Sequence, residues 1–194
     1  MEKTVTLKDG DEVVIRDMTS EDAEASHAFF TSLPPEDRRY LRVDVTQREL
    51  VQRRIADAAS GRVHRLVVVD DGDIVADGAL EIEGHGWGQN VAEIRVIVAR
   101  PYQRRGLGLL LARELYYLAA ARRMDRIVVR MMRPQTGATR IFRKLGFRDE
   151  FLIPEHVRDQ SGTWQDMIIM RCNLEDLWRE IEGVFEVSDW RRSR

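Results

Sequence analysis

Apolar residues follow two spacings along the chain, and the change from one to the other separates expected strands from expected helices. Alternation at every second position is typical of a strand with one buried face. The clearest case is VAEIRVIVA, in which Ala92, Ile94, Val96 and Val98 share a face and Pro101 ends the run. Six further segments favour strands: EVVIRDM within residues 4–18, RLVVVD, IVADGALEIE, RIVVRMM, FLIPEHV and DMIIMRCNL.

Capping residues mark where the first two helices begin and end. TSED is a capping box in which Thr19 is the N-cap and Asp22 reaches back, and the prolines at 34–35 end that helix. A second box, TQRE at 46–49, predicts a helix that runs to about Ala59. The stretch between them, EDRRYLRVDV, has no clear period and is expected to be a connector.

A longer amphipathic helix is predicted over about 108–123. Its apolar stripe, at spacings of four and three, consists of Leu111, Leu115, Leu118 and Ala119. Arg113 and Glu114 interrupt this stripe and are expected to face water. TGATRIFRKLGF predicts a shorter helix that Gly146 closes, and NLEDLWREIEGVF predicts a last helix capped by Asn173. This order of elements indicates a mixed α/β fold with a central sheet.

Composition narrows the class of protein. The 194 residues, 33% charged and 43% hydrophobic, fit one domain over 1–194, with a core at about 13–173 and a C-terminal helix and tail at 174–194. The formal net charge of −2 argues against a nucleic-acid partner. Cys172 is the only cysteine, so we expect no internal disulfide and a reducing compartment. Without a signal-like N-terminus or an apolar run of roughly 18 residues, we expect a cytoplasmic protein with no membrane partner.

Two glycines, Gly106 and Gly108, stand at the start of the long helix, in QRRGLG at 103–108. A helix N-terminus exposes unpaired N–H groups that suit an anion, and glycine lets a phosphate approach the backbone. The Rossmann pattern needs a third glycine where this chain has Leu111, and the Walker A pattern needs a lysine that this loop lacks. The pattern that remains is Q-x-x-G-x-G between a strand and a helix.

This segment resembles the coenzyme A motif of the GNAT superfamily of acyl-CoA-dependent N-acyltransferases. AEIRVIVARPYQRRGLG is similar to the family's fourth strand and pyrophosphate loop, and IFRKLGF is similar to its second signature, a helix that ends in Leu-Gly-Phe. The order of elements agrees over about 13–173. The resemblance implies a mixed, mostly antiparallel, twisted sheet of about seven strands flanked by helices. It also implies acetyl-CoA as cosubstrate, with no metal.

The resemblance further implies where coenzyme A would lie. N–H groups of the loop would cradle the pyrophosphate while two arginines add positive charge. The pantetheine arm would lie along the strand VAEIRVIVA, which must then separate from RIVVRMM and leave backbone groups unpaired. The expected contacts are Val96, Ile97, Val98, Gln103, Arg104, Arg105, Gly106, Leu107, Gly108, Leu109, Gln135 and Phe142.

Acyl transfer to a lysine amine needs a base, because the pKa of that amine is roughly 10.4. Many relatives, including bacterial Pat-type protein-lysine acetyltransferases, carry a glutamate at the place of Glu93. We therefore expect Glu93 to be the base, directly or through water. A purely structural ion pair with an arginine such as Arg95 is the alternative. Glu81, Glu83 and His85 are rival bases near the end of the preceding strand.

Two positions depart from the family pattern. Phe142 stands where many members carry a tyrosine that protonates the thiolate, which leaves water or one of Tyr102, Tyr116 and Tyr117 for that role. Gln135 replaces a frequent asparagine and is still expected to bind pantetheine.

The sequence predicts the identity of the acceptor amine less well than it predicts the fold or the cosubstrate. Residues 15–42 resemble the segment that opens Pat-type catalytic domains, which implies a protein lysine as acceptor, such as one on an acyl-CoA synthetase. Small cationic amines stay open, as does a non-catalytic acetyl-CoA sensor. Glu21, Asp22 and Glu24 would attract a cationic acceptor or merely favour the start of a helix. The basic tail at 187–194 leaves a homodimer open.

Overall fold

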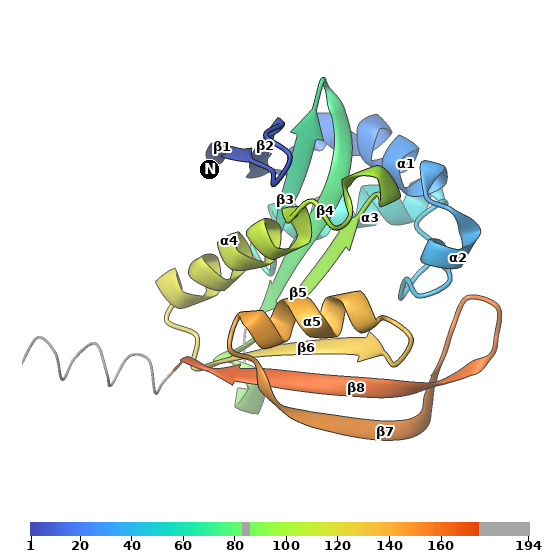
Figure 1. The fold of residues 1–194 in the computed structure, drawn as a ribbon, viewed down its shortest axis with the longest axis vertical. Coiled ribbons are helices and arrows are strands. Elements are labelled where there is room, and N and C mark those ends of the chain that lie inside the picture. The colour runs from blue at the N-terminus through green and yellow to red at the C-terminus, as the bar shows by residue number, and fades with distance from the viewer. Residues whose placement is uncertain (83–85, 175–194) are drawn as a thin grey trace, which may run out of the picture.

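The computed structural model describes residues 1–82 and 86–174, and an eight-stranded sheet forms its centre (Figure 1). The strands are β1 (Glu2–Thr6), β2 (Glu12–Asp17), β3 (Val63–Asp70), β4 (Asp73–Ile82), β5 (Val91–Val98), β6 (Arg126–Met132), β7 (Arg148–Arg158) and β8 (Trp164–Asn173). They lie in the order β1-β2-β3-β4-β5-β6-β8-β7, and only the β5–β6 pair is parallel. The expected mixed, mostly antiparallel sheet is confirmed, with one strand more than the seven predicted.

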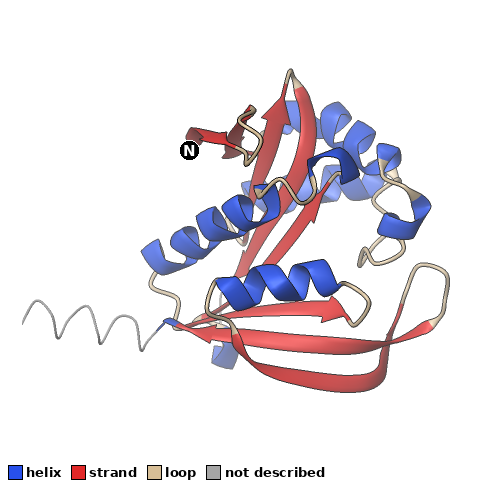
Figure 2. Cartoon of the chain, viewed as in Figure 1, coloured by secondary structure: helices blue, strands red, loops and turns tan. Residues whose placement is uncertain are grey.

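Helices α4 and α5 cover one face of the sheet, and α1 and α3 cover the other (Figure 2). The helices are α1 (Ala23–Ser32), α2 (Pro35–Arg38), α3 (Arg48–Ala59), α4 (Leu107–Ala121) and α5 (Thr136–Lys144). Side chains alternate along β3, so Leu66 and Val68 belong to the core beneath α4, while Val67 joins Phe29 and Phe30 of α1. The sheet therefore separates two apolar layers.

Close packing of α4 on the sheet depends on Gly78 of β4. A Cβ atom at this position would lie 2.9 Å from Cδ1 of Leu115 and 3.0 Å from Cγ of Leu111. These two leucines are fully buried as predicted, whereas Leu118 is only half-buried. Because α4 carries the glycine loop at its N-terminus, the missing side chain helps to set the distance between that loop and the strands.

The N-terminal segment forms a hairpin of two strands rather than the single predicted strand. Strand β1 lies at the sheet edge and buries only Val5, so it shows no alternating apolar pattern that would predict it. Lys3 of β1 donates to Oε1 of Glu114 at 2.8 Å. Glu114 is 7% exposed, so the expectation that it faces water was wrong. An ion pair from a distant part of the chain keeps this carboxylate beneath the hairpin.

The capping box ahead of α1 is confirmed. The Thr19 N–H donates to Oδ2 of Asp22 at 2.7 Å. The same carboxylate accepts hydrogen bonds from Nη1 and Nη2 of Arg16, at 2.8 and 2.7 Å. Asp22 is therefore a structural residue that ties the helix start to β2.

The second predicted box is wrong in detail, although its helix is present. Helix α3 begins at Arg48 with Gln47 as the N-cap residue. The Thr46 hydroxyl instead donates to Asp44 at 2.6 Å, because a nearby aspartate competes for the capping hydroxyl.

The C-terminal end of the described chain closes with β8. Gly146 has a φ of 84° and ends α5 as predicted. Asn173 is the last residue of β8, and its predicted role as a helix cap depends on residues outside the described part. The predicted last helix and the basic tail lie in residues 175–194, outside the described residues.

Candidate active site

The glycine loop that joins β5 to α4 has the backbone shape of an anion site. Gly106, the N-cap of α4, has a φ of 93°, and Arg104 has a φ of 62°. Left-handed residues of this kind turn successive N–H groups into a shared concavity. Within the described residues, no backbone carbonyl accepts from the N–H of Gly106, Leu107 or Gly108, whereas the Leu109 N–H donates to Gly106 O at 3.1 Å. Three free N–H groups at a helix start fit a pyrophosphate.

The two glycines have different structural causes. A Cβ atom on Gly106 would meet only the Lys8 side chain, no closer than 3.4 Å, so the positive φ is what requires glycine there. A Cβ atom on Gly108 would lie 2.9 Å from Cδ1 of Ile141 in α5. Packing of α4 against α5 therefore accounts for Gly108, in addition to any approach by a phosphate.

The Arg105 side chain, which was expected to contact the pyrophosphate, instead contacts other residues of the protein. Its guanidinium forms ion pairs with Asp9 and Asp11 in the β1–β2 turn and lies over the ring of Tyr102, 5.1 Å from its centroid. The hydrogen bond from Arg105 holds the pKa of Asp9 below its ordinary value. Arg105 thus fastens the loop to the N-terminal hairpin.

Two other basic side chains are available to a phosphate. Arg104 is exposed and forms no ion pair with any described residue. Lys8 lies beside Gly106, and its backbone N–H donates to Arg105 O at 3.0 Å. Nothing in the sequence pattern pointed to Lys8, because only the β1–β2 hairpin brings it to the loop.

Strands β5 and β6 pair at their beginning and then separate (Figure 1). Their parallel pairing runs from Val91 to Glu93 of β5 and stops, while β5 stays paired with β4 as far as Val98. The separation expected from the family resemblance is therefore present. It leaves backbone groups of β5 without a strand partner on the β6 side, which is what an added pantetheine chain requires.

A cavity of about 100 Å³ opens where these strands separate, and we refer to it as the cleft. Four of the expected cofactor contacts line it: Val96, Ile97, Gln135 and Phe142. The Gln135 side chain is held by Met132, whose N–H donates to its Oε1 at 2.8 Å. Val98 lies outside the lining, and its carbonyl accepts from Nε2 of Gln103 at 3.0 Å.

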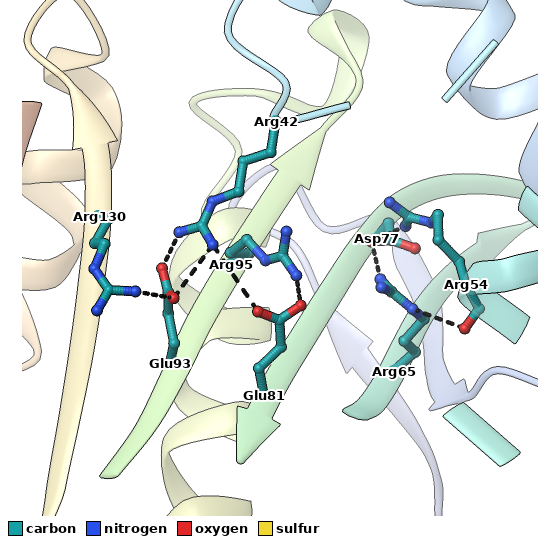
Figure 3. A network of polar contacts seen from close by, with 8 residues as sticks. All are labelled: Arg42, Arg54, Arg65, Asp77, Glu81, Glu93, Arg95 and Arg130. Atoms are coloured by element: carbon teal, nitrogen blue, oxygen red, sulfur yellow. Dashed lines mark hydrogen bonds and ion pairs between the residues drawn. The ribbon is translucent and has the colours of Figure 1, made fainter. Parts of the chain in front are cut away.

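Glu93 lies on β5 at the point of separation and is 9% exposed (Figure 3). Its carboxylate accepts from Nη1 and Nη2 of Arg42, the first at 3.2 Å, and from Nη1 of Arg130 at 2.6 Å. Arg95 pairs instead with Glu81. The pairing of Glu93 with arginine is therefore found, with different arginines from the one expected. For Glu93 to accept a proton, an amine or a water must replace one of these contacts.

The tyrosines considered from sequence lie away from the cleft lining, but another is present there. The Tyr102 hydroxyl donates to Asp70 at 2.6 Å, and this bond raises the pKa of Tyr102 to about 12. Burial raises the pKa of Tyr116 to about 12, and Tyr117 is exposed. Tyr40, from the connector after α2, lines the cleft. Its connector has no periodic pattern, so only tertiary structure identifies it.

Several expected alternatives lose support or fall outside the described part. Glu83 and His85 lie among the residues that the structure does not describe, and Glu81 is engaged by Arg95 and, at 3.9 Å, by Arg42. At the start of α1, Glu24 pairs with Arg48, so the acidic residues there do not form a free cation site.

Burial raises the pKa of the Cys172 thiol, as expected for an inert core cysteine. Among the described residues, no three His, Cys, Asp or Glu side chains are placed to share a metal ion. No helix within the same residues has the length and apolar character to cross a bilayer.

A larger cavity of about 560 Å³ adjoins the cleft and shares Leu41, Val43 and Val45 with it as walls. We refer to it as the outer cavity. It lies between α2, the connector after α2 and the β7–β8 turn. Its remaining lining carries both charges: Pro35, Glu36, Arg38, Arg39, Asp44, Thr46, Gln160 and Ser161.

Asp159 in the β7–β8 turn anchors one wall of the outer cavity. Its buried carboxylate accepts from Arg39 at 2.6 Å, Ser161 at 2.6 Å and Gln165 at 2.8 Å. The neighbouring Gln160 donates its backbone N–H to Arg39 O at 2.9 Å. The turn is thereby fixed to the connector that supplies Tyr40 and Arg42.

This anchor predicts a loss of stability in acid. Burial by itself would raise the pKa of Asp159, but hydrogen bonds from Ser161, Arg39 and Gln165 hold it well below its ordinary value of 3.8. A carboxyl with a lower pKa in the folded chain stabilises the fold above about pH 4, and this stabilisation disappears as the pH falls further. Replacing Asp159 with asparagine should lower Tm at pH 7 by a few degrees and flatten the fall in Tm between about pH 5 and 3.

Thermal melts of the two proteins over that pH range provide the measurement. The comparison is between proteins, because other carboxylates, such as Asp22, also have a lowered pKa and contribute to acid unfolding in both. Parallel pH curves would show that the Asp159 contacts do not stabilise the turn.

Comparisons with known proteins agree with this geometry. The pattern of the Acetyltransferase (GNAT) family matches residues 22–147. The fold is similar to that of the GNAT domain of S. lividans PAT, with 18% identity, a TM-score of 0.72, and coverage of 89% of this chain and 97% of that one. It is also similar to Mycobacterium smegmatis RimJ in complex with CoA-disulfide, with 20% identity, a TM-score of 0.71, and coverage of 91% and 88%.

A third similar structure is the ribosomal-protein-alanine N-acetyltransferase from Brucella melitensis, with 19% identity, a TM-score of 0.72, and coverage of 82% and 99%. Identities this low establish a shared fold, while the family pattern itself spans well over half of the chain. The chain therefore belongs to the GNAT acetyltransferase family and is an acetyl-CoA-dependent N-acetyltransferase.

Proposed function

We propose that this enzyme transfers the acetyl group of acetyl-CoA to a lysine side chain of a protein in the cytoplasm. The observation that carries the proposal is the outer cavity, which borders the cleft at Leu41, Val43 and Val45 and is several times larger. A lysine side chain is long enough to pass from a protein surface through such a space to a buried thioester. The resemblance of residues 15–42 to Pat-type domains supports the same acceptor, and so does the fold shared with the GNAT domain of S. lividans PAT.

The proposed chemistry is direct attack of the amine on the thioester in a ternary complex. Coenzyme A would bind with its pyrophosphate on the N–H groups of Gly106, Leu107 and Gly108 and its pantetheine arm beside Val96 and Ile97 of β5. A backbone N–H of β5 that faces the opening would donate to the carbonyl oxygen as negative charge develops on it.

Glu93 is the proposed base, directly or through one water. It lies at the end of the β5–β6 pairing, where an extended pantetheine chain along β5 would bring the thioester. The Arg42 and Arg130 guanidinium groups hold the carboxylate in place until an amine or a water displaces one of them.

The acceptor can be tested with three substrate panels. Acetyl-CoA labelled in the acetyl group is incubated with the enzyme and lysate proteins, with peptides that have a free α-amine, and with small polyamines. Label on protein lysine side chains is the expected result. Label confined to N-terminal amines or to polyamines would identify a different acceptor and overturn the lysine proposal.

Tyr40 is the proposed proton donor to the departing thiolate, because it is the only tyrosine in the cleft lining and Phe142 cannot donate. Replacing Tyr40 with phenylalanine should lower kcat by roughly 10²-fold, since it removes a general acid, while the KM for acetyl-CoA changes little. Tyr117→Phe, which alters an exposed tyrosine on α4, is the matched control and should leave kcat unchanged. A Tyr40→Phe enzyme with normal kcat would leave water as the proton donor.

A further inference from the structure

The lining of the cleft carries positive charge, and the carboxylates that pair with it lie outside the lining. Arg42, Arg54, Arg95 and Arg130 all contribute to its surface, and no aspartate or glutamate does. These arginines come from four separate elements: the connector after α2, α3, β5 and β6. A neutral acetyl group gains nothing from a positively charged lining, and such a lining repels a protonated amine.

The arginines around the cleft outnumber the carboxylates that pair with them. In Figure 3, five arginines share three carboxylates, because Arg65 also competes for one of them. Asp77 accepts from Arg54 at 2.7 Å and from Arg65 at 3.5 Å. Glu93 is likewise shared between two arginines of the lining. Pairing within the described residues therefore leaves excess positive charge facing the cleft.

Two of the lining arginines also have an unused donor. Nε of Arg54 and Nε of Arg95 are buried, and neither has a hydrogen-bond partner in the described structure. A buried donor without a partner costs free energy, so these two donors would gain from an acceptor that enters the cleft. Burial and then the nearby charges of Arg42, Arg65 and Arg54 lower the pKa of Arg95 to about 9, which agrees with a site short of negative charge.

We propose that the cleft binds a carboxylate carried by one of the two substrates, next to the reacting thioester. The inference rests on the proposed function and narrows its substrate class. Guanidinium groups bind carboxylates through charge-assisted, often bidentate hydrogen bonds. The same lining disfavours polyamines and other acceptors that bring only positive charge.

The carboxylate has two chemical sources, and they can be separated. It is either the terminal carboxylate of a dicarboxylic acyl chain on coenzyme A, or an acidic group beside the acceptor amine. Calorimetry compares the affinity of the full chain for succinyl-CoA and acetyl-CoA. A second titration compares the coenzyme A-saturated protein with two peptides that differ only in a glutamate or a glutamine next to a lysine.

A preference of about tenfold or more for the carboxylate-bearing member of either pair is the expected result, as for a charge-assisted hydrogen bond. Arg95→Gln should reduce that preference to less than about threefold, and Arg54→Gln is a second variant in case the first unfolds. Arg48→Gln removes the same charge from an exposed position on α3, where Arg48 pairs with Glu24, and should keep the preference.

Ratios within twofold of one in both titrations would overturn the carboxylate site. If neither peptide binds measurably, a ratio within twofold of one for succinyl-CoA and acetyl-CoA would overturn it alone. Failure of coenzyme A itself to bind is a separate result, which would overturn the proposed function. Loss of the preference in Arg48→Gln as well as in Arg95→Gln would show a general charge effect and would also overturn the site.

Discussion

Replacing Glu93 with glutamine is expected to lower kcat by roughly 10²- to 10³-fold. The reason is that glutamine has a similar shape but cannot accept the proton of the attacking amine. The substitution also weakens the ion pairs with Arg42 and Arg130, which are partly exposed, so a loss of about 1–2 kcal/mol in the free energy of unfolding should accompany it. Steady-state kinetics and a urea melt measure the two effects separately.

Arg130→Gln is the matched control for the structural effect. It breaks the 2.6 Å contact with Glu93 from the other side but leaves the carboxylate in place. If Glu93 is the base, Arg130→Gln should lose much less activity than Glu93→Gln. Equal losses of activity in both variants would assign Glu93 to positioning Arg42 and Arg130 instead of proton transfer.

Replacing Gly106 with valine should raise the Kd of coenzyme A by roughly 10- to 100-fold, which corresponds to about 1.4–2.8 kcal/mol. Gly106 has a φ of 93°, a conformation that a β-branched residue adopts only at a cost of about 1–3 kcal/mol. Relief of that strain would turn the N–H groups of Gly106, Leu107 and Gly108 away from a common point. Calorimetric titration with coenzyme A measures the change.

Gly61→Val separates loss of the loop from general strain. Gly61 has a φ of 77° with no atom within 4 Å of an added Cβ, and it lies in the chain between α3 and β3. Valine there should lower Tm to a similar extent but leave the Kd of coenzyme A unchanged. If Gly106→Val also left the Kd unchanged, the helix start would not be the pyrophosphate site, and the proposed path of coenzyme A along β5 would have to be abandoned.

The parts of the site that depend on neighbouring residues could be predicted from the sequence. The glycine loop is one: its shape follows from a few consecutive backbone conformations, so QRRGLG at 103–108 predicts both the helix start and the free N–H groups. The alternation in VAEIRVIVA likewise predicts that Val96 faces the α4 side of the sheet and Glu93 the other side. The sequence does not predict that a side chain at position 108 would collide with Ile141, because this depends on how α4 packs against α5.

The connector between α2 and α3 shows the opposite case. It has no hydrophobic period, yet it supplies Tyr40 to the cleft and Arg42 to Glu93, because the Asp159 turn fixes it from a distant strand pair. The burial of Glu114 under Lys3 has the same origin, an ion pair across 111 positions of the chain. A local sequence pattern does not predict which distant residue a charged side chain will contact in the folded protein.

The sequence by itself determined the family, the order of nearly all strands and helices, and the loop on which a pyrophosphate can rest, since these depend on short-range periodicity and backbone conformation. Only the tertiary structure decided that β5 and β6 separate after Glu93 and that four arginines from four elements line the opening. Electrostatic partners are chosen by distance in space, and folding brings together charges that the chain keeps far apart.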